Sequence, residues 1–297
     1  MDDERSAASA PPPVHDRRGV LLANARDAAA RRRPSQLLDQ WADDSPVATS
    51  AVDLRTSVAL DALALAAASE YEALLLSPVA PIGVTSVLAP TSQDRVLSTI
   101  RPVEVVSDPT NVLALEAARR LRGEPAASVR LCTVHQTLRM QPAPAGRGRT
   151  RHFRMSALAD AGRARGDDAF EVDAVLAQLG AYRRLLEAAA AAGIGGGDRP
   201  RAIVRVDGEH AVLGDRVAAA ILERWPEVEV VREPLANAAY YDGLRVGYGL
   251  HAPGGDVVEL VDVGRFDWVA QLTSDRRSRF VASAIGIQLL PLLFAGT

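Results

Sequence analysis

The chain has 297 residues, of which 48% are hydrophobic and 24% charged, and its net charge is -3 at pH 7. A chain of this length can form a hydrophobic core that needs neither a disulfide nor a metal for stability. The small net charge does not indicate nucleic-acid binding, which is typical of strongly basic proteins. The single cysteine, Cys132, excludes an internal disulfide and a cysteine-based metal site, and it fits a reducing compartment.

All 34 basic residues are arginines, because the sequence contains no lysine. The chain therefore lacks the amine that Schiff-base chemistry and P-loop phosphate sites require. No apolar run approaches the roughly 20 residues that cross a bilayer, and the first residues are acidic where a secretory signal would be basic. These features predict a cytoplasmic protein with no membrane partner.

Residues 1–50 are rich in Ala, Pro, Arg and Asp, with a proline run at Pro11–Pro13 and an arginine cluster at Arg31–Arg33. The proline run predicts extended backbone. The arginines favour a solvated face, with an RNA-contacting arm as the alternative. We expect a poorly ordered N-terminal arm over residues 1–50, followed by a core over residues 51–297.

The first part of the core combines helices with short strands. Residues 54–76 are rich in Leu and Ala and contain neither Pro nor Gly, which predicts a helix. Residues 84–88 and 103–106 predict strands. Asp108-Pro109-Thr110 then starts a predicted helix over 111–122.

The middle of the chain predicts a hairpin followed by a long helix. Residues 129–134 and 153–158 favour two strands, joined by a loop over 141–151 that is rich in Pro, Gly and Arg. Residues 171–192 predict a helix that ends before Gly195–Gly197. This glycine run follows a helix instead of connecting a strand to one, so it predicts a joint and not a phosphate-binding loop.

The last third predicts a small strand-helix-strand insert near residues 200–232 and then strands over 244–251, 257–263 and 280–283. A turn is expected at Pro253-Gly254-Gly255. Strands joined by hairpins favour an antiparallel sheet, and the helices between them favour an α+β fold in which helices flank that sheet.

Four short motifs stand in order along the core. They are Val105-Val106-Ser107-Asp108-Pro109-Thr110, then Arg139-Met140-Gln141 with Arg151-His152-Phe153, then Tyr240-Tyr241-Asp242-Gly243 with Val263-Gly264-Arg265-Phe266-Asp267, and finally Ala284-Ile285-Gly286-Ile287-Gln288-Leu289-Leu290. From about Tyr71 to the C terminus, this order resembles the catalytic core of class II aminoacyl-tRNA synthetases, and within that class the histidyl-tRNA synthetase branch. The resemblance implies the same class II core fold.

The resemblance also implies which residues face an amino acid. Asp108 and Thr110 take the acidic and hydroxyl places of the family's Arg-Pro-Glu-x-Thr element. The tyrosine pair is similar to a segment of the histidine pocket, and Gly264-Arg265-Phe266-Asp267 resembles a reduced Gly-Gly-Arg-Tyr-Asp element. The implied amino-acid-binding residues are Asp108, Thr110, Tyr240, Tyr241, Arg265 and Asp267.

The nucleotide side of the family's site departs from the pattern. The residues implied to bind ATP, if that role were retained, are Arg139, Gln141, Arg151 and Arg154. Gln141 and His152 replace expected glutamates, and Gln288 or a neighbouring leucine replaces the arginine of the last motif. The arginine before the tyrosine pair is also replaced. One lost charge-stabilising donor costs a factor of about 100 to 1,000 in rate, so several losses argue against adenylation.

The family's amino-acid-binding residues are largely matched, whereas several of its ATP-binding residues are replaced. This combination implies a paralogue that does not charge tRNA and that has no catalytic residues and no cofactor. The resemblance is nearest to the regulatory subunit of ATP phosphoribosyltransferase in histidine biosynthesis. It implies a free amino acid as ligand, with histidine as the first candidate, a catalytic partner subunit and a homodimer. The short stretch after the last motif leaves no room for an anticodon-binding domain, so tRNA is not an expected partner.

Two other functions stay open at this point. In the first, the chain is an ATP- and Mg-dependent ligase that adenylates an amino acid or small carboxylic acid for an acceptor other than tRNA. In the second, it is a structural remnant with neither ligand. Binding of ATP with magnesium would favour the ligase, and binding of an amino acid alone would favour the regulatory paralogue.

Several of these residues also have simple structural roles to play. Asp108 is a good helix cap, the tyrosines suit sheet packing, and Arg265 and Asp267 could form a same-face pair on a strand. The five histidines are scattered without ligand spacing, so no metal site is predicted. Cys132 has apolar neighbours, which favours a buried structural thiol over a nucleophile.

Overall fold

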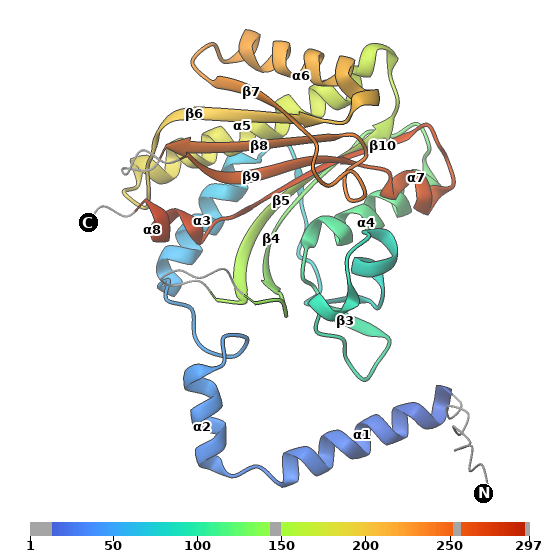
Figure 1. The fold of residues 1–297 in the computed structure, drawn as a ribbon, viewed down its shortest axis with the longest axis vertical. Helices are drawn as coiled ribbons and strands as arrows, with labels where there is room; N and C mark the ends of the chain where they lie inside the picture. Colours follow the sequence, from blue (N-terminus) through green and yellow to red (C-terminus); the bar gives the residue numbers. More distant parts are fainter. Residues whose placement is uncertain (1–13, 143–149, 252–256, 295–297) are drawn as a thin grey trace, which may run out of the picture.

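The computed structural model describes residues 14–142, 150–251 and 257–294, so the Pro11–Pro13 run and the turn expected at Pro253-Gly254-Gly255 lie outside the described residues. These ranges form a large twisted sheet (Figure 1). Its strand order is β1 (Glu72–Ala73), β4 (Val129–Leu138), β5 (His152–Arg163), β10 (Ser278–Gly286), β9 (Val257–Phe266), β8 (Leu244–His251), β6 (Asp198–Val206) and β7 (Glu229–Pro234). Neighbouring strands run antiparallel except in the outermost pairs β1–β4 and β6–β7, which are parallel.

Helices cover both faces of this sheet. On one face lie α3 (Leu54–Ala67), α5 (Ala169–Ala191) and α6 (Ala211–Arg224), and on the other lie α4 (Pro109–Gly123) and α7 (Trp268–Thr273). A two-stranded sheet of β2 (Val79–Pro81) and β3 (Val103–Val105) lies near α4, and α8 (Leu289–Leu293) follows β10. This α+β architecture confirms the predicted fold class.

The alternation of side chains along the strands divides the core in two. Cys132 and Leu158 face α3 and α5, whereas Leu131 and Ala157 face α4. Because both faces of the central strands are covered, β5 is buried almost without interruption from Met155 to Gly162.

The hairpin of β4 and β5 and the long helix α5 are as predicted. The two strands pair from Val129↔Ala161 to Leu138↔His152. Strand β4 begins where predicted but continues four residues further, and β5 is longer than predicted at both ends. The expected strand-helix-strand insert forms β6, α6 and β7. Strand β6 pairs antiparallel with β8, so this unit extends the main sheet instead of standing apart from it.

Two predicted elements are wrong in type or length. Residues Val84–Leu88 form a π-helix and not a strand. Gly83 turns the chain with a φ of 92°, and the buried carboxylate of Glu104 accepts hydrogen bonds from the N–H groups of Gly83 and Thr85, at 2.7 and 3.0 Å. These tertiary bonds outweigh the strand propensity of the segment. The helix expected over 54–76 ends at Ala67, because residues 72–73 pair with β4 as an edge strand.

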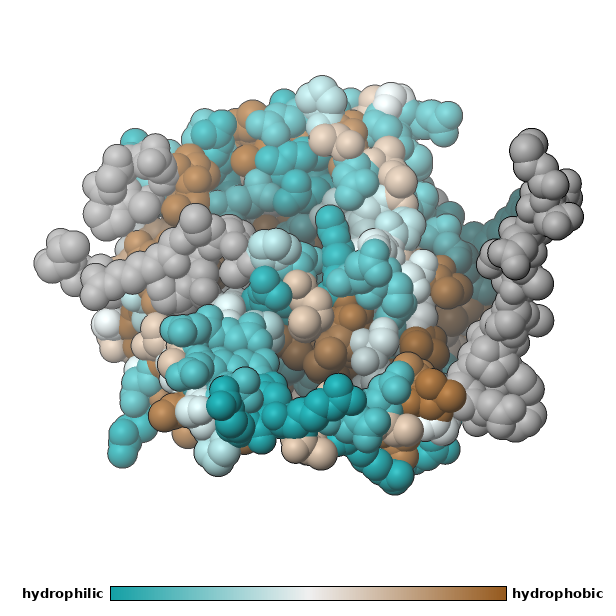
Figure 2. Space-filling view, turned by 60° about the horizontal axis from the view of Figure 1, so that its bottom comes forward, coloured by the Kyte–Doolittle hydropathy of each residue, from teal (hydrophilic) through white to brown (hydrophobic). Residues whose placement is uncertain are grey.

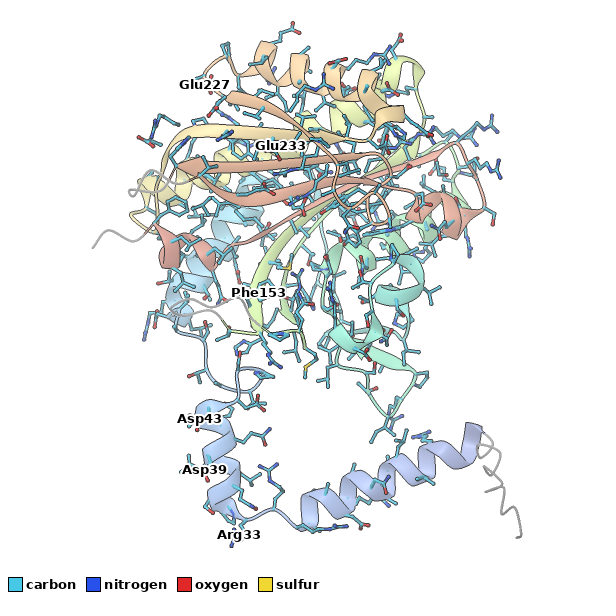
Figure 3. The ribbon with its side chains drawn as sticks, viewed as in Figure 1. Arg33, Asp39, Asp43, Phe153, Glu227 and Glu233 are labelled. Carbon is cyan, nitrogen blue, oxygen red and sulfur yellow. The ribbon has the colours of Figure 1, made fainter. Side chains whose placement is uncertain are left out.

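The N-terminal segment contains two helices, α1 (Val14–Ala30) and α2 (Pro34–Asp43), where the sequence analysis expected none. They project from the body, and Figure 3 places Arg33, Asp39 and Asp43 away from it. No residue of α2 is buried, so its helical form does not depend on packing against the described core.

The described part of the chain contains no helix that is both long and apolar enough to cross a membrane. Figure 2 shows the molecule from below the view of Figure 1, and hydrophobic residues gather near the centre of a mainly hydrophilic face.

Candidate functional site

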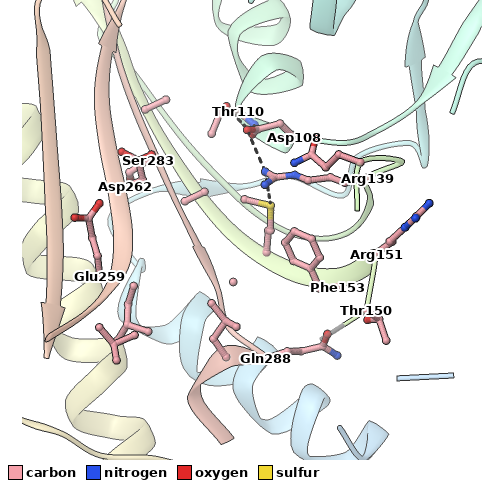
Figure 4. Close-up of a pocket in the computed structure, with 18 of the residues that line it drawn as sticks. Asp108, Thr110, Arg139, Thr150, Arg151, Phe153, Glu259, Asp262, Ser283 and Gln288 are labelled. Carbon is pink, nitrogen blue, oxygen red and sulfur yellow. Dashed lines mark hydrogen bonds and ion pairs between the residues drawn. The ribbon is translucent and has the colours of Figure 1, made fainter. Parts of the chain in front are cut away.

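A cavity of about 460 Å³ lies on the sheet face that carries α4 (Figure 4). Its volume is typical of small-molecule sites, which span about 300 to 1,000 Å³. Ala282, Ala284 and Gly286 of β10 line it, and their small size leaves the hollow open. The other walls come from the start of α4, the β4–β5 hairpin, the tyrosine pair, β9 and α8.

One end of the cavity is polar. Asp108 stands before the first turn of α4, and its Oδ1 accepts hydrogen bonds from the backbone N–H of Thr110 at 3.0 Å and from the Thr110 hydroxyl at 2.7 Å. Its Oδ2 lies 3.6 Å from Nη2 of Arg139. Asp108 therefore caps the helix, which is the structural role that its sequence position predicted. It also presents a carboxylate oxygen to the cavity.

Arg139 is held in place from three sides. Its Nε donates to the backbone carbonyl of Ser107 at 3.1 Å, and Nη2 lies 3.8 Å from the sulfur of Met155. The guanidinium carbon sits 5.3 Å from the centre of the Phe153 ring, a cation–π distance. This fixed guanidinium next to Asp108 offers a positive and a negative group side by side at the same end of the cavity.

The tyrosine pair forms an aromatic wall. Tyr240 packs edge-on against Tyr241 and Phe266, with ring centroids 4.9 and 5.5 Å apart. Burial, followed by the charge of Asp108, raises the pKa of the Tyr240 hydroxyl. Burial also raises the pKa of Tyr241, whose hydroxyl donates to Asp262 at 2.6 Å. Both hydroxyls thus stay protonated and can donate hydrogen bonds.

Strand β9 contributes two carboxylates that the sequence analysis missed, Glu259 and Asp262. Strict alternation would send residues 259 and 262 to opposite faces, but the β8–β9 register shifts between Tyr248↔Val261 and Gly249↔Glu259. The bulge leaves Leu260 without a partner on β8 and turns both carboxylates toward the cavity. A bulge depends on tertiary pairing, which the sequence does not show directly. The only sequence signal for these two carboxylates was the pattern Glu259-Leu260-Val261-Asp262, with an acidic residue on either side of an apolar pair.

Two arginines pair with these carboxylates, and one of them, Arg205, is shared with Glu233 of β7 at 2.9 Å. Arg245 of β8 donates to Glu259 and, at 2.9 Å, to Asp262, and Arg205 of β6 donates to Glu259 at 2.9 Å. A side chain at Gly247 would collide with Glu259, since a Cβ there would lie 2.4 Å from its carboxyl carbon. The glycine therefore gives the Glu259 carboxylate room to lie between the two guanidinium groups.

The opposite end of the cavity is apolar. It is lined by Val258, Leu260, Leu289, Leu292 and Leu293, and the side chains of Phe153 and Met155 continue this surface toward Arg139. Among the leucines of α8, Leu290 is buried in the core, whereas Leu289, Leu292 and Leu293 are only partly buried. These three present apolar surface to the cavity.

Most of the predicted site residues meet at this cavity. The structure brings together Asp108, Thr110, Tyr240 and Tyr241 of the amino-acid set and Arg139, Gln141 and Arg151 of the nucleotide set. Arg151 donates to the backbone carbonyl of Met140 at 3.1 Å and lies at the mouth of the hairpin. Sequence motifs far apart along the chain thus form one site.

Three predicted residues do not line the cavity. Arg154 forms an ion pair with Asp61 of α3, because its neighbours Phe153 and Met155 take the cavity face of β5. Arg265 lies on the α5 face of β9, where it pairs with Asp242 at 2.9 Å and faces the buried Glu171. Asp267 is exposed at the start of α7. The same-face pair of Arg265 and Asp267 does not form.

Gln288 has a structural position at the edge of the cavity. Its Oε1 accepts from the backbone N–H of Arg154 at 3.2 Å, and its Nε2 donates to the Ser57 hydroxyl of α3 at 3.3 Å. The Gln288 carboxamide thus links the cavity wall to α3.

The described residues support neither a metal site nor a reactive thiol. Within residues 14–142, 150–251 and 257–294, no three His, Cys, Asp or Glu side chains are grouped so as to hold a metal ion. Cys132 is buried on β4, and burial raises the pKa of its thiol to about 11. A thiol that is protonated at neutral pH makes a poor nucleophile.

No family model matches the sequence, and no curated protein matches it. Solved structures do match. One is an ATP phosphoribosyltransferase regulatory subunit/histidyl-tRNA synthetase from Bacillus halodurans, with 11% identity and a TM-score of 0.62 over 80% of this chain and 78% of that chain. Another is a histidine–tRNA ligase subunit from Alicyclobacillus acidocaldarius, with 14% identity and a TM-score of 0.59 over 84% of this chain and 96% of that one.

The fold is that of the class II aminoacyl-tRNA synthetase core. Histidyl-tRNA synthetase from S. aureus also matches, with 13% identity and a TM-score of 0.56, and the match covers 79% of this chain and 63% of the synthetase. The neighbours confirm the resemblance at the level of the class II core fold, and proteins of the histidyl branch are among them. With identities of 11 to 14%, they establish the fold alone, so the activity has to be inferred from the residues of the site.

Proposed function

We propose that this chain is a non-charging paralogue of the histidyl-tRNA synthetase branch that binds a free amino acid and regulates a catalytic partner subunit. The partner class is an ATP phosphoribosyltransferase, because the Bacillus halodurans neighbour is an ATP phosphoribosyltransferase regulatory subunit/histidyl-tRNA synthetase. The proposal includes a homodimer in the cytoplasm, with no bound cofactor and no tRNA.

One observation carries this proposal. The amino-acid end of the cavity keeps Asp108, Thr110 and the tyrosine pair, whereas two positions expected on the nucleotide side are used by the fold. Arg154 is paired with Asp61, and Gln288 is bonded to the backbone of Arg154 and to Ser57. Moving Arg154 to a phosphate would leave the half-buried Asp61 carboxylate without its partner, which is costly.

The alternative ligase needs cations that stabilise charge on a transferring phosphoryl group. Of the three arginines implied to bind ATP, Arg139 and Arg151 reach the cavity, whereas Arg154 is paired with Asp61. This arrangement favours amino-acid binding without adenylation.

The homodimer part of the proposal is supported by α3. Its outward side carries the exposed apolar residues Leu54, Val58 and Leu65, which lie at spacings of four and seven residues on one face of the helix. If a second copy of the chain packed against this face of α3, the three apolar side chains would be removed from water. Sedimentation of the purified chain should give twice the mass of the monomer, and a Leu54→Glu/Val58→Glu variant should shift it to the monomer.

The regulatory role is tested by mixing the chain with the catalytic subunit of a short-form ATP phosphoribosyltransferase. The account predicts a complex on gel filtration and a partner activity that changes when an amino acid is added. The Asp108→Asn variant should form the same complex without the amino-acid response. Amino-acid-dependent pyrophosphate release by the chain alone, with ATP and magnesium, would replace the regulatory proposal with the ligase.

A further inference from the structure

We propose that the cavity selects an α-amino acid with a bulky apolar side chain, in preference to histidine or another basic amino acid. This inference rests on the proposed amino-acid-binding function and narrows the ligand within it. It is carried by three regions of the cavity that differ in charge: the Asp108–Arg139 end, the β9 wall and the α8 end.

The Asp108–Arg139 end suits the part that all amino acids share. Oδ1 of Asp108 is used by Thr110, but Oδ2 lies 3.6 Å from Arg139, outside hydrogen-bond distance. This oxygen is placed to accept from a ligand ammonium. Arg139 uses Nε and Nη2 within the protein, and no partner of its Nη1 is found among the described residues. That nitrogen is placed to donate to a ligand carboxylate.

The β9 wall has two carboxylates, which at first suggests a cationic side chain. Each of their four oxygens already accepts a hydrogen bond within the protein: Glu259 from Arg205 and Arg245, and Asp262 from Arg245 and Tyr241. Arg205 also donates to Glu233 of β7 at 2.9 Å, outside the cavity. A ligand cation at the β9 wall would therefore lose its hydration without meeting a carboxylate oxygen that lacks a hydrogen bond, which is unfavourable.

The α8 end supplies the surface for the side chain. Val258, Leu260, Leu289, Leu292 and Leu293 carry no polar side-chain atom that could pair with an imidazole or a guanidinium group. A polar ligand group placed there would be buried without a hydrogen bond from these side chains, whereas an apolar group gains free energy from each CH₂ that it buries. The apolar end therefore favours leucine- or phenylalanine-like ligands.

The test is calorimetric titration of the full chain with L-leucine, L-phenylalanine, L-histidine and L-arginine, without nucleotide. We expect leucine or phenylalanine to bind at least tenfold more tightly than histidine and arginine. Removing the ammonium, with 3-phenylpropionate as the probe, should weaken binding at least tenfold because Oδ2 of Asp108 would then lose its hydrogen-bond donor.

Two variants test whether the α8 end and the β9 wall determine the ligand selectivity. Leu292→Asp puts a charge into the α8 end and should weaken leucine or phenylalanine binding at least tenfold. Arg245→Leu leaves Glu259 and Asp262 undercompensated, and it should raise the affinity for arginine or histidine relative to leucine at least tenfold. Arg201→Leu is the matched control, since Arg201 pairs with Glu229 at the outer edge of the sheet and does not line the cavity. Its binding profile should equal that of the wild type.

The outcomes separate the two proposals. Tight binding of histidine or arginine by the wild type would overturn the apolar selectivity and leave the amino-acid-binding function standing. No binding of any amino acid would overturn both. If Arg245→Leu does not fold, which thermal unfolding reveals, the ligand panel and Leu292→Asp still decide: unchanged leucine and phenylalanine affinity in Leu292→Asp would contradict the proposal.

Discussion

Single residues in this molecule serve the fold and the cavity together, and Asp108 is the clearest case. It caps α4 through Thr110 and also turns an oxygen toward the cavity. Glu104 is a purely structural counterpart. Its buried carboxylate accepts from two backbone N–H groups and from Gln93, and so fixes the turn at Gly83. Burial opposes its ionisation, but the hydrogen bonds prevail and lower its pKa.

Asp108→Asn separates the two roles of Asp108. Asparagine caps helices about as well as aspartate, so the free energy of unfolding should change by less than about 0.5 kcal/mol. The lost negative charge should weaken amino-acid binding at least tenfold in calorimetry. Asp108→Ala should lose both the binding and about 0.5 to 2 kcal/mol of stability. Wild-type affinity in Asp108→Asn would contradict the assignment of this end of the cavity.

Glu104→Gln should destabilise the fold in a pH-dependent way. One carboxamide oxygen cannot replace two carboxylate oxygens, so we expect a loss of about 1 to 3 kcal/mol at pH 7. Because the pKa of Glu104 is lowered in the folded state, its contribution is present above the unfolded pKa of about 4.3 and is lost as the pH falls through the lower folded value. Urea unfolding should therefore show a smaller difference between variant and wild type below about pH 4. An equal difference at pH 7 and pH 3 would contradict this role.

Cys132 should be unreactive in the folded protein. Burial raises the pKa of its thiol from an ordinary value of 9.0 to about 11, which lowers the thiolate fraction at pH 8 about 100-fold, and burial also restricts access of reagents. Alkylation by iodoacetamide should thus be more than about 100-fold slower in buffer than in 6 M urea. Equal rates would show that the thiol is accessible and active.

At the scale of elements, the β8–β9 pair builds the charged wall of the cavity. The bulge at Leu260 brings Glu259 to the face of Asp262, and Gly247 leaves room for the Glu259 carboxylate. Arg205 and Arg245 then hold the two carboxylates from neighbouring strands. The shape of this wall thus depends on pairing across three strands.

Gly247→Ala tests this arrangement. The new Cβ would lie 2.4 Å from the carboxyl carbon of Glu259, so the carboxylate must leave its two arginines. We expect a loss of about 1 to 3 kcal/mol in urea unfolding. Gly123→Ala is the control, since a Cβ there meets nothing within 4 Å, and it should be neutral or slightly stabilising. Equal stability of the two variants would contradict the close fit at Gly247.

The elements also show what the sequence could predict. The β4–β5 hairpin and α5 follow from local periodicity, and the class II resemblance located Asp108, Thr110 and the tyrosine pair at one cavity. The motifs did not specify which face of a strand each residue takes. Arg154 and Arg265 lie on the far face of their strands, and Glu259 joins the near face through a bulge. Strand face depends on register and pairing, which single-residue motifs do not encode.

At the scale of the whole molecule, an N-terminal arm stands apart from the body that forms the cavity. Helix α2 buries no residue in the described structure, although Leu37, Leu38 and Trp41 are apolar and exposed. The segment after α2 does contact the β4–β5 hairpin. The N–H of Arg151 donates to the Ser45 hydroxyl at 3.0 Å, and His152 contacts the carbonyl of Ala48 at 2.6 Å.

Removal of the arm should therefore leave the body stable. A chain that begins at Asp44 keeps the contacts of Ser45 and Ala48, and we expect its free energy of unfolding to lie within about 0.5 kcal/mol of the full chain at low protein concentration. Amino-acid binding should also be unchanged. A large loss of stability would mean that the arm packs against the body or a second copy in solution.

The central claim is that the cavity binds a free amino acid without nucleotide. The most direct test is thermal unfolding of the full chain against the twenty amino acids, each with and without ATP and magnesium. A ligand at 100 times its dissociation constant adds about 2.7 kcal/mol of stability, which raises the melting temperature by several degrees. The account predicts this rise with at least one amino acid alone and no further rise with ATP and magnesium. A rise that requires ATP, or no rise with any amino acid, would contradict it.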